Sequence, residues 1–183
     1  MIRIGLIGTG KHGGRYARHI VADLAGEARL VAISRRDREA GARQAAELGC
    51  RYHADYRELI ASPEVEAVVV VVPPTLHREI CAAVAAARKP ALFEKPAAPS
   101  VADARAMLAA AEAAGIAVMV AQTLRYNSVV RALRAALADI GAVHAVRLSQ
   151  RFEPSPLGWI DDPRVSGGGM ILHTGVHSFD LLR

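Results

Sequence analysis

The stretch "IRIGLIGTGKHG", residues 2–13, decides the fold. Its apolar start predicts a buried strand, and Gly8, Gly10 and Gly13 follow at the spacing GxGxxG, before a segment that predicts a helix over 12–24. In this position the first glycine permits a tight turn, the second lets the backbone approach a pyrophosphate, and the third lets the helix lie close to the strand. The stretch therefore predicts a phosphate-binding loop at a helix N-terminus.

The pattern of strand and helix continues as far as residue 121. The predicted strands cover 2–8, 29–34, 66–72, 90–94 and 116–121. The predicted helices cover 12–24, 37–49, 55–62, 76–88 and 100–115, with Asp37 and Ser100 as N-caps and Gly49 and Gly115 at the helix ends. Strands that are apolar throughout are typical of a parallel sheet covered by helices on both faces. We expect an α/β fold, a doubly wound parallel sheet of the Rossmann type, over residues 1–121.

The pattern changes in residues 122–183. This region predicts a helix over 127–139, an alternating strand over 142–152, a proline-rich loop over 153–166 and a closing helix from 167 to 183. One strand cannot form a sheet alone, because its backbone groups have no partner. We therefore expect an incomplete α+β second domain: either part of a longer protein, or a short relative whose uncovered apolar surface favours a homo-oligomer.

The composition excludes several classes of protein. The chain of 183 residues is 52% hydrophobic and 22% charged, as expected of a globular protein. No apolar run approaches the roughly 20 residues that cross a bilayer, and the N-terminus does not resemble a signal peptide. We expect a cytoplasmic protein that does not enter a membrane. The two cysteines, Cys50 and Cys81, lack CxxC spacing and are expected to be small buried side chains.

The net charge of +5 does not predict nucleic-acid binding. The basic residues are spread along the chain, and aromatic residues make up only 4% of it, so neither a basic patch nor a stacking platform is indicated. The excess positive charge would instead attract an anionic cofactor or substrate.

The end of the second predicted strand, "ISRRD" at 33–37, indicates which dinucleotide binds. A site for NAD usually places an acidic residue here to accept hydrogen bonds from the ribose 2′-hydroxyl. Ser34 is neutral, and the guanidinium groups of Arg35 and Arg36 suit a phosphate. We therefore predict NADP rather than NAD. The alternative is that both arginines are solvated and Asp37 contacts the ribose, although Asp37 better fits a helix cap.

Two histidines near the C-terminus, His173 and His177, are four residues apart and so lie on one face of a helix. They could bind a metal, transfer protons or be surface residues. The zinc-protease pattern needs Glu after the first histidine, where this chain has Thr174. Another metal site would need a third ligand, such as Asp180 or Glu153. We predict proton transfer and no metal.

Several motifs occur in a characteristic order. After GxGxxG come "PPTLH" (73–77), "EKP" (94–96), "LRYN" (124–127) and "WIDDPRVSGGGMILHTGVHSFDLL" (159–182). Over nearly the whole chain this order resembles the Gfo/Idh/MocA oxidoreductases. The resemblance implies a dinucleotide-binding domain followed by a substrate domain. It also implies hydride transfer between nicotinamide and a secondary alcohol or ketone of a sugar, cyclitol or similar polyol.

The resemblance also implies roles for particular residues. Lys95 would contact the nicotinamide ribose and the substrate hydroxyl, and His177 would be the general acid/base. A proton donor and a cation are what reduction of a carbonyl by hydride requires. The predicted catalytic residues are Lys95, His177 and His173. The predicted cofactor-binding residues are Gly8, Thr9, Gly10, Lys11, His12, Gly13, Ser34, Arg35, Arg36, Pro73, His77, Glu94 and Lys95, and the bond before Pro96 can be cis.

The chain departs from the family pattern at two positions. The family commonly has an aspartate where His173 stands and an arginine where Ile160 stands. Without that aspartate, the pKa of His177 loses a group that would raise it, and a nearby imidazole would lower it. These departures leave two alternatives open: a non-catalytic NADP-binding sensor or partner subunit, and a metal-dependent enzyme that uses both histidines.

Overall fold

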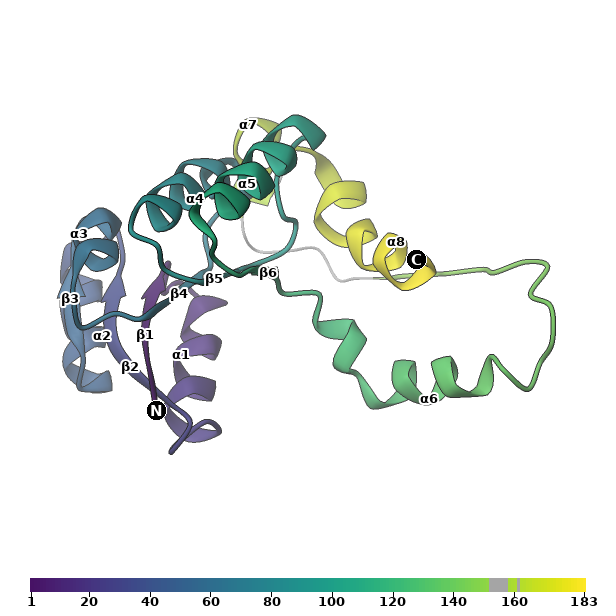
Figure 1. The fold of residues 1–183 in the computed structure, drawn as a ribbon, viewed down its shortest axis with the longest axis horizontal. Coiled ribbons are helices and arrows are strands. Elements are labelled where there is room, and N and C mark those ends of the chain that lie inside the picture. The colour runs from purple at the N-terminus through teal and green to yellow at the C-terminus, as the bar shows by residue number, and fades with distance from the viewer. Residues whose placement is uncertain (152–157, 161) are drawn as a thin grey trace.

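The computed structural model describes residues 1–151, 158–160 and 162–183 (Figure 1). Its N-terminal part is a six-stranded sheet in the order β3-β2-β1-β4-β5-β6. All neighbouring strands are parallel. The strands are β1 (Ile2–Ile7), β2 (Ala28–Ser34), β3 (Arg51–His53), β4 (Ala67–Val70), β5 (Ala91–Phe93) and β6 (Val118–Val120). The strand order reverses between β1 and β4, where sheets of this kind bind ligands beyond the carboxyl ends of the strands.

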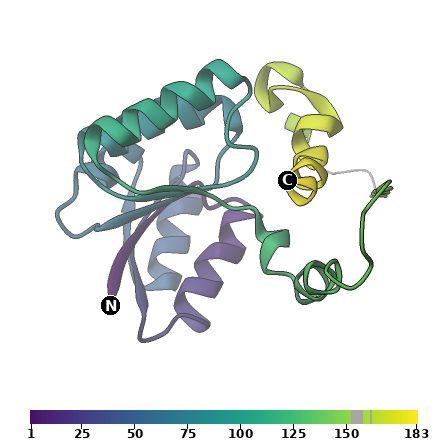
Figure 2. The same cartoon turned by 45° about the vertical axis from the view of Figure 1, so that its right-hand side comes forward.

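Helices cover both faces of the sheet. They are α1 (Gly13–Ala22), α2 (Arg38–Leu48), α3 (Tyr56–Ala61), α4 (His77–Ala86) and α5 (Val101–Ala114). Figures 1 and 2 show α1 and α2 on one face and α4 and α5 on the other. The doubly wound fold predicted for residues 1–121 is thus confirmed.

The predicted helix caps are also confirmed. The Asp37 side chain accepts a hydrogen bond from the backbone N–H of Ala40, and α2 ends at Gly49 in the left-handed region, with φ of 63°. The same arrangement begins α5 at Ser100 and ends it at Gly115, with φ of 65°. Glycine at these ends avoids the steric cost of a Cβ atom in the left-handed region.

The sheet separates two apolar clusters. Val68 and Phe93 pack with Ile80 of α4 on one face, whereas Leu6 and Val69 pack with α1 on the other. Successive strand residues point to opposite faces, which is why neighbouring valines of β4 enter different clusters. Each such buried side chain contributes about 1.5–3 kcal/mol.

The two cysteines differ in burial. Cys81 is fully buried in the first cluster, as predicted. Cys50 is only half-buried, at the edge of the second cluster, which corrects the prediction that both are buried. No disulfide joins them, since both are free thiols.

The edge strand β3 was absent from the prediction. It has three residues, Arg51–His53, and no apolar run. It pairs with the end of β2, and its central residue Tyr52 lies against Gly41 and donates a hydrogen bond of 2.8 Å from its hydroxyl to the Arg35 carbonyl. Pairing and this side-chain contact therefore define the strand, rather than any pattern in its sequence.

Short helices make up the regular structure of residues 122–183. They are η2 (Thr123–Tyr126), α6 (Ser128–Ala136), η3 (Gly158–Ile160), α7 (Pro163–Ser166), a π-helical turn η4 (Ile171–Gly175) and α8 (Val176–Leu182). The α6 helix confirms the helix predicted there. The closing helix predicted from 167 to 183 is confirmed from residue 169 to Leu182, where the helical turns are continuous and the π-helical turn η4 lies within the helix. The predicted loop over 153–166 holds η3 and α7, and residues 153–157 and 161 lie outside the described part.

The strand predicted over 142–152 is wrong for its described residues. Residues 142–151 form no strand and are exposed, and residue 152 lies outside the described part. No other strand of residues 122–151, 158–160 or 162–183 is available to pair with them. An alternating pattern alone cannot hold a strand whose backbone groups lack a ladder partner.

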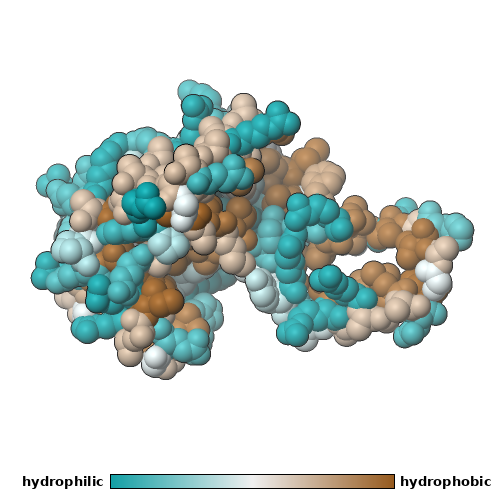
Figure 3. All heavy atoms as spheres, in the orientation of Figure 1, coloured by the Kyte–Doolittle hydropathy of each residue, from teal (hydrophilic) through white to brown (hydrophobic). Residues whose placement is uncertain are grey.

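The second region reaches away from the sheet. Figure 1 shows α6 and the residues after it as an extended arm, and Figure 3 shows apolar side chains along its inner side. Val129, Leu133 and Ile140 are exposed. Where the structure is described, no helix combines the length and the apolar character needed to cross a bilayer.

Candidate active site

The glycine loop has the geometry that a dinucleotide needs. Gly8 has φ of +87°, and a Cβ atom on it would lie 2.1 Å from the Val71 carbonyl oxygen. A Cβ atom on Gly13 would lie 1.8 Å from the Gly8 carbonyl oxygen. A Cβ atom on Gly10, in contrast, would meet no described atom within 4 Å. The first and third glycines thus allow close packing, and the second leaves open the approach that a pyrophosphate takes.

The start of α1 is open to an anion. His12 stands at the N-cap without a side-chain cap, and the first turn holds no acidic residue. Thr9 is 1% exposed, and its hydroxyl has no partner among the residues described. Lys11 is exposed beside them. The positive end of the helix dipole favours phosphate here.

The end of β2 presents cations next to this loop. Ser34 is buried, Arg35 is half-buried and Arg36 is exposed. The Arg35 guanidinium reaches the Thr9 carbonyl at 3.4 Å and the Gln44 side-chain oxygen at 3.3 Å. The carboxylate of Asp37 accepts a 3.0 Å bond from the Ala40 N–H, which gives it the helix-capping role.

His77 lies inside the protein. It is fully buried, and its ring nitrogens lie 3.0 Å from the Ala97 carbonyl oxygen and 3.1 Å from that of Val72. Burial lowers its pKa, although the two carbonyls and the charge of Glu94 oppose this. The ring therefore joins the loops that follow β4 and β5.

Glu94 faces α1. It is 8% exposed, and one carboxylate oxygen, Oε1, accepts bonds from His12 Nε2 at 2.8 Å and from the Tyr16 hydroxyl at 2.7 Å. The other, Oε2, accepts a 2.7 Å bond from the Lys95 N–H, and the Lys95–Pro96 bond is cis. Burial alone would raise the pKa of Glu94, but the bonds from His12 and Tyr16 hold it below its usual value.

Lys95 joins the two regions of the chain. Its ammonium Nζ donates a 2.9 Å hydrogen bond to the backbone carbonyl of His173 in the π-helical turn. Burial lowers the pKa of Lys95, and the charge of Glu94 opposes this. The three predicted catalytic residues lie within electrostatic range, because the charge of Lys95 acts on both His173 and His177, and His177 acts on His173.

Both C-terminal histidines are favoured in the neutral form. Burial, and next the charge of Lys95, lowers the pKa of His173 and of His177. The His173 ring lies 3.3 Å from the Thr174 hydroxyl. The Nδ1 atom of His177 is buried and has no hydrogen-bond partner in the described part of the chain. A neutral imidazole with an uncommitted nitrogen can accept a proton.

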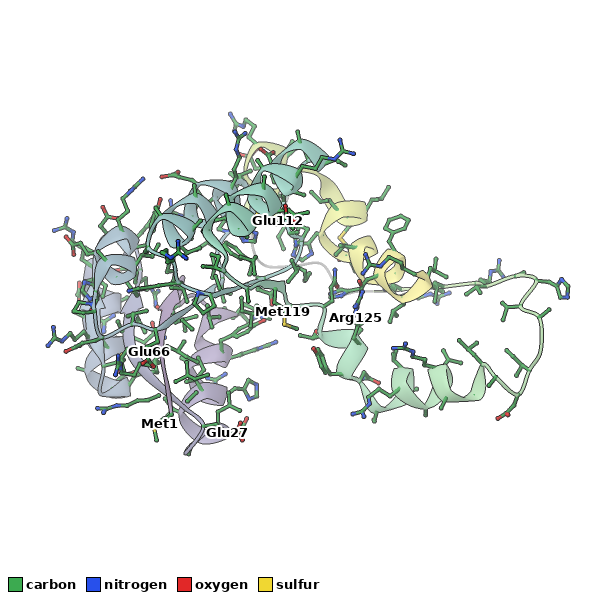
Figure 4. All side chains as sticks on the ribbon, in the orientation of Figure 1. Met1, Glu27, Glu66, Glu112, Met119 and Arg125 are labelled. Atoms are coloured by element: carbon green, nitrogen blue, oxygen red, sulfur yellow. The ribbon has the colours of Figure 1, made fainter. Side chains whose placement is uncertain are left out.

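Arg125 and Asp180 form a bidentate ion pair between η2 and α8. The distances are 2.7 Å and 2.6 Å, and Figure 4 shows Arg125 beside the last helix. Residues 1–151, 158–160 and 162–183 contain no group of three His, Cys, Asp or Glu side chains able to hold a metal. Asp180 is thus engaged by arginine, and Glu153, the other ligand considered, lies outside the described residues.

Two residues of the site carried no predicted role. Arg125 belongs to the "LRYN" motif, and Tyr16 follows His12 by one helical turn. The signal for Tyr16 was its i, i+4 spacing from a loop histidine at the start of a helix. Ile160, where the family commonly has arginine, is buried at 8% exposure.

A glycine loop at the switch point of a six-stranded parallel sheet defines a dinucleotide-binding domain of the Rossmann class. The family described as "Oxidoreductase family, NAD-binding Rossmann fold" matches residues 2–122. The chain belongs to this family, the Gfo/Idh/MocA oxidoreductases.

Individual relatives agree with this assignment. The chain is 35% identical to a 1,5-anhydro-D-fructose reductase of Ensifer adhaerens, in an alignment covering 100% of this chain and 56% of the relative. It is 33% identical to a myo-inositol 2-dehydrogenase of Thermotoga maritima, in an alignment covering 100% of this chain and 54% of the relative. The structure of a levoglucosan dehydrogenase in complex with NADH and levoglucosan matches with a TM-score of 0.84 and 28% identity. The match covers 100% of this chain and 53% of the dehydrogenase. The chain therefore spans about half the length of these proteins.

Proposed function

We propose that the protein transfers hydride between NADP and a secondary alcohol or ketone of a sugar, cyclitol or related polyol. The observation that carries this is the bond from Lys95 Nζ to the His173 carbonyl, which brings the lysine and the histidine-bearing helix together beside the glycine loop. The names of the reductase and the two dehydrogenases support the substrate class.

The residues of the loop suit the cofactor. The N–H groups at the start of α1 would hold the pyrophosphate over Gly10, and Arg35 and Arg36 would hold a 2′-phosphate. When bound, the nicotinamide ring supplies the position that accepts or releases hydride. The preference for NADP rests on the neutral Ser34 and the two arginines, and it is a proposal because the levoglucosan dehydrogenase structure contains NADH.

Two side chains would act on the substrate oxygen. Lys95 is a cation that can orient the hydroxyl and stabilise negative charge developing on its oxygen. His177 has a pKa below its ordinary value because of burial, and so it can accept the hydroxyl proton near neutral pH. In the opposite direction the protonated ring returns that proton. The His173 backbone carbonyl positions the lysine.

Substitution of the two residues tests this function. Lys95→Met and His177→Asn should each lower kcat for NADPH-dependent reduction of a ketose and inosose panel by about 100-fold or more. His177→Asn should bind NADPH as the wild type does, and Lys95→Met should still bind it through the glycine loop, more weakly because the contact with the nicotinamide ribose is lost. His19→Asn, on the exposed far end of α1, is the matched control and should retain activity.

The alternative of a non-catalytic NADP-binding protein gives a different result. Wild-type protein that binds NADPH tightly, and turns over no member of the panel in either direction, would contradict the proposed enzyme and support the sensor.

A further inference from the structure

Glu94 is held by two residues that neither the glycine motif nor "EKP" specifies. His12 and Tyr16 are four positions apart on α1, so both reach the same side of the helix. Both bond to the same atom, Glu94 Oε1, at 2.8 Å and 2.7 Å. Their rings also pack edge to face, with centroids 5.6 Å apart. We call His12, Tyr16 and Glu94 the Glu94 clamp.

The clamp keeps a buried carboxylate charged. Only 9% of the Glu94 side chain is exposed, and burial of an ionised carboxylate is costly unless hydrogen bonds satisfy it. Three donors do so: His12, Tyr16 and the Lys95 N–H. Burial and the bond to Glu94 raise the pKa of Tyr16, so this hydroxyl remains a donor across the physiological range.

The negative charge of Glu94 acts on four basic side chains of the site. It raises the pKa of Lys95, His173 and His177 against the effect of burial. It acts in the same way on His77. The other carboxylate that raises the pKa of His177 is Asp180, which is already paired with Arg125. Position 173, where the family commonly has an acid, carries a base in this chain.

The clamp also connects the two halves of the dinucleotide site. His12 lies in the glycine loop, at the end of β1, and Glu94 directly follows β5, next to Lys95. The strand between them is β4. The hydrogen bonds of the clamp therefore cross from the loop that would hold the pyrophosphate to the lysine that would contact the substrate.

We propose that His12 and Tyr16 are positioning residues that fix the Glu94 carboxylate as the counter-charge of Lys95 and of the two C-terminal histidines. The catalytic consequence rests on the proposed function. The clamp itself is a property of the protein without cofactor, and so it can be tested separately from turnover.

The first test is an NMR titration of the His173 and His177 ring protons in cofactor-free protein. Lys95 and Glu94 act on both rings; His177 and His12 also act on His173, and Asp180 also acts on His177. Glu94→Gln removes the anion and keeps the side-chain size, so both histidine midpoints should fall, by roughly 0.5 pH unit or more.

The second variant tests the positioning. Tyr16→Phe changes no charge at neutral pH and removes one donor to Glu94, so it should lower the same midpoints by a smaller amount. Glu112→Gln, an exposed carboxylate of α5, is the matched control and should leave both midpoints unchanged. If Glu94→Gln does not fold, as judged by its amide spectrum, Tyr16→Phe decides alone, because phenylalanine preserves the packing.

Unchanged midpoints in Glu94→Gln, or wild-type midpoints in Tyr16→Phe, would overturn the proposal. In the enzyme, Tyr16→Phe should lower kcat severalfold while changing the KM for NADPH little. His12→Gln, which can still donate to Glu94, should retain more activity than His12→Ala; equal loss in both would contradict the role of His12. A wild-type protein without turnover would remove the proposed function and leave the titration result intact.

Discussion

Lys95 Nζ donates a 2.9 Å hydrogen bond to the backbone carbonyl of His173, a residue 78 positions further along the chain. Because the acceptor is a main-chain atom, the contact depends on the path of the π-helical turn and not on the type of side chain at position 173. Single π turns within helices are frequent at functional sites. The backbone of the turn thus contacts the lysine, and the charge of the side chain at 173 is a separate property of the site.

His173→Asp tests that separation of roles. The Lys95 contact should persist, and the new carboxylate should raise the pKa of His177, which burial and the charge of Lys95 now keep low. An NMR titration of His177 should show an upward shift of the midpoint. His173→Asn is the matched neutral control, and a midpoint that is equal in the two variants would contradict the prediction.

The pH dependence of alcohol oxidation follows from the lowered pKa of His177. In the proposed reaction its neutral form accepts the proton, so kcat/KM should rise with pH through a midpoint below the ordinary histidine value of about 6.5 and then level off. The measurement is kcat/KM for NADP reduction from pH 5 to 8. A midpoint above 7 would show that another group controls the reaction.

Stability should respond to the same groups. His173 and His177 have folded-state pKa values below the unfolded value of about 6.5, so the unfolded chain binds more protons. Their contribution to stability is present above about pH 6.5 and is lost as the pH falls through the folded pKa. In urea unfolding, the free energy of unfolding of the double variant His173→Asn/His177→Asn should decline less below about pH 6.5 than that of the wild type. Identical pH profiles would contradict this contribution of the two histidines.

The second and third loop glycines should behave differently. A Cβ atom at Gly13 would lie 1.8 Å from the Gly8 carbonyl oxygen, so Gly13→Ala should destabilise the protein by more than about 2 kcal/mol. Gly10→Ala meets no described atom within 4 Å, so it should change stability by less than about 0.5 kcal/mol. It should nevertheless weaken NADPH binding about tenfold or more, because the methyl group occupies the approach of the pyrophosphate. Urea unfolding and NADPH titration would separate the effects; unchanged NADPH affinity in Gly10→Ala would contradict this placement.

The sequence predicted the part of the fold that local patterns control. Apolar strands, the glycine loop and the caps at Asp37 and Ser100 all depend on short-range chemistry, and the structure contains them. The strand β3 was missed because its three residues have no apolar pattern and are defined by pairing with β2. The strand predicted over 142–152 was wrong because alternation does not supply a hydrogen-bonding partner.

The site was predictable at the level of residue types and less so at the level of contacts. Motif order placed Lys95 and His177 in one site, and the structure brings them together. The contact of Glu94 with α1 depends on Tyr16, whose spacing from His12 is visible in the sequence but has meaning only once the residue after β5 reaches the start of α1. His77 was assigned to the cofactor site, and its ring is buried between two loops.

The proposal that the protein is an NADP-dependent oxidoreductase is tested first by titrating the wild-type protein with NADPH and with NADH and monitoring binding by fluorescence. NADPH should bind at least about tenfold more tightly, because Arg35 and Arg36 would hold the 2′-phosphate, and Arg35→Ala/Arg36→Ala should remove most of this preference. Equal or tighter binding of NADH would contradict the assignment of NADP, and failure to bind either dinucleotide would contradict the proposed oxidoreductase.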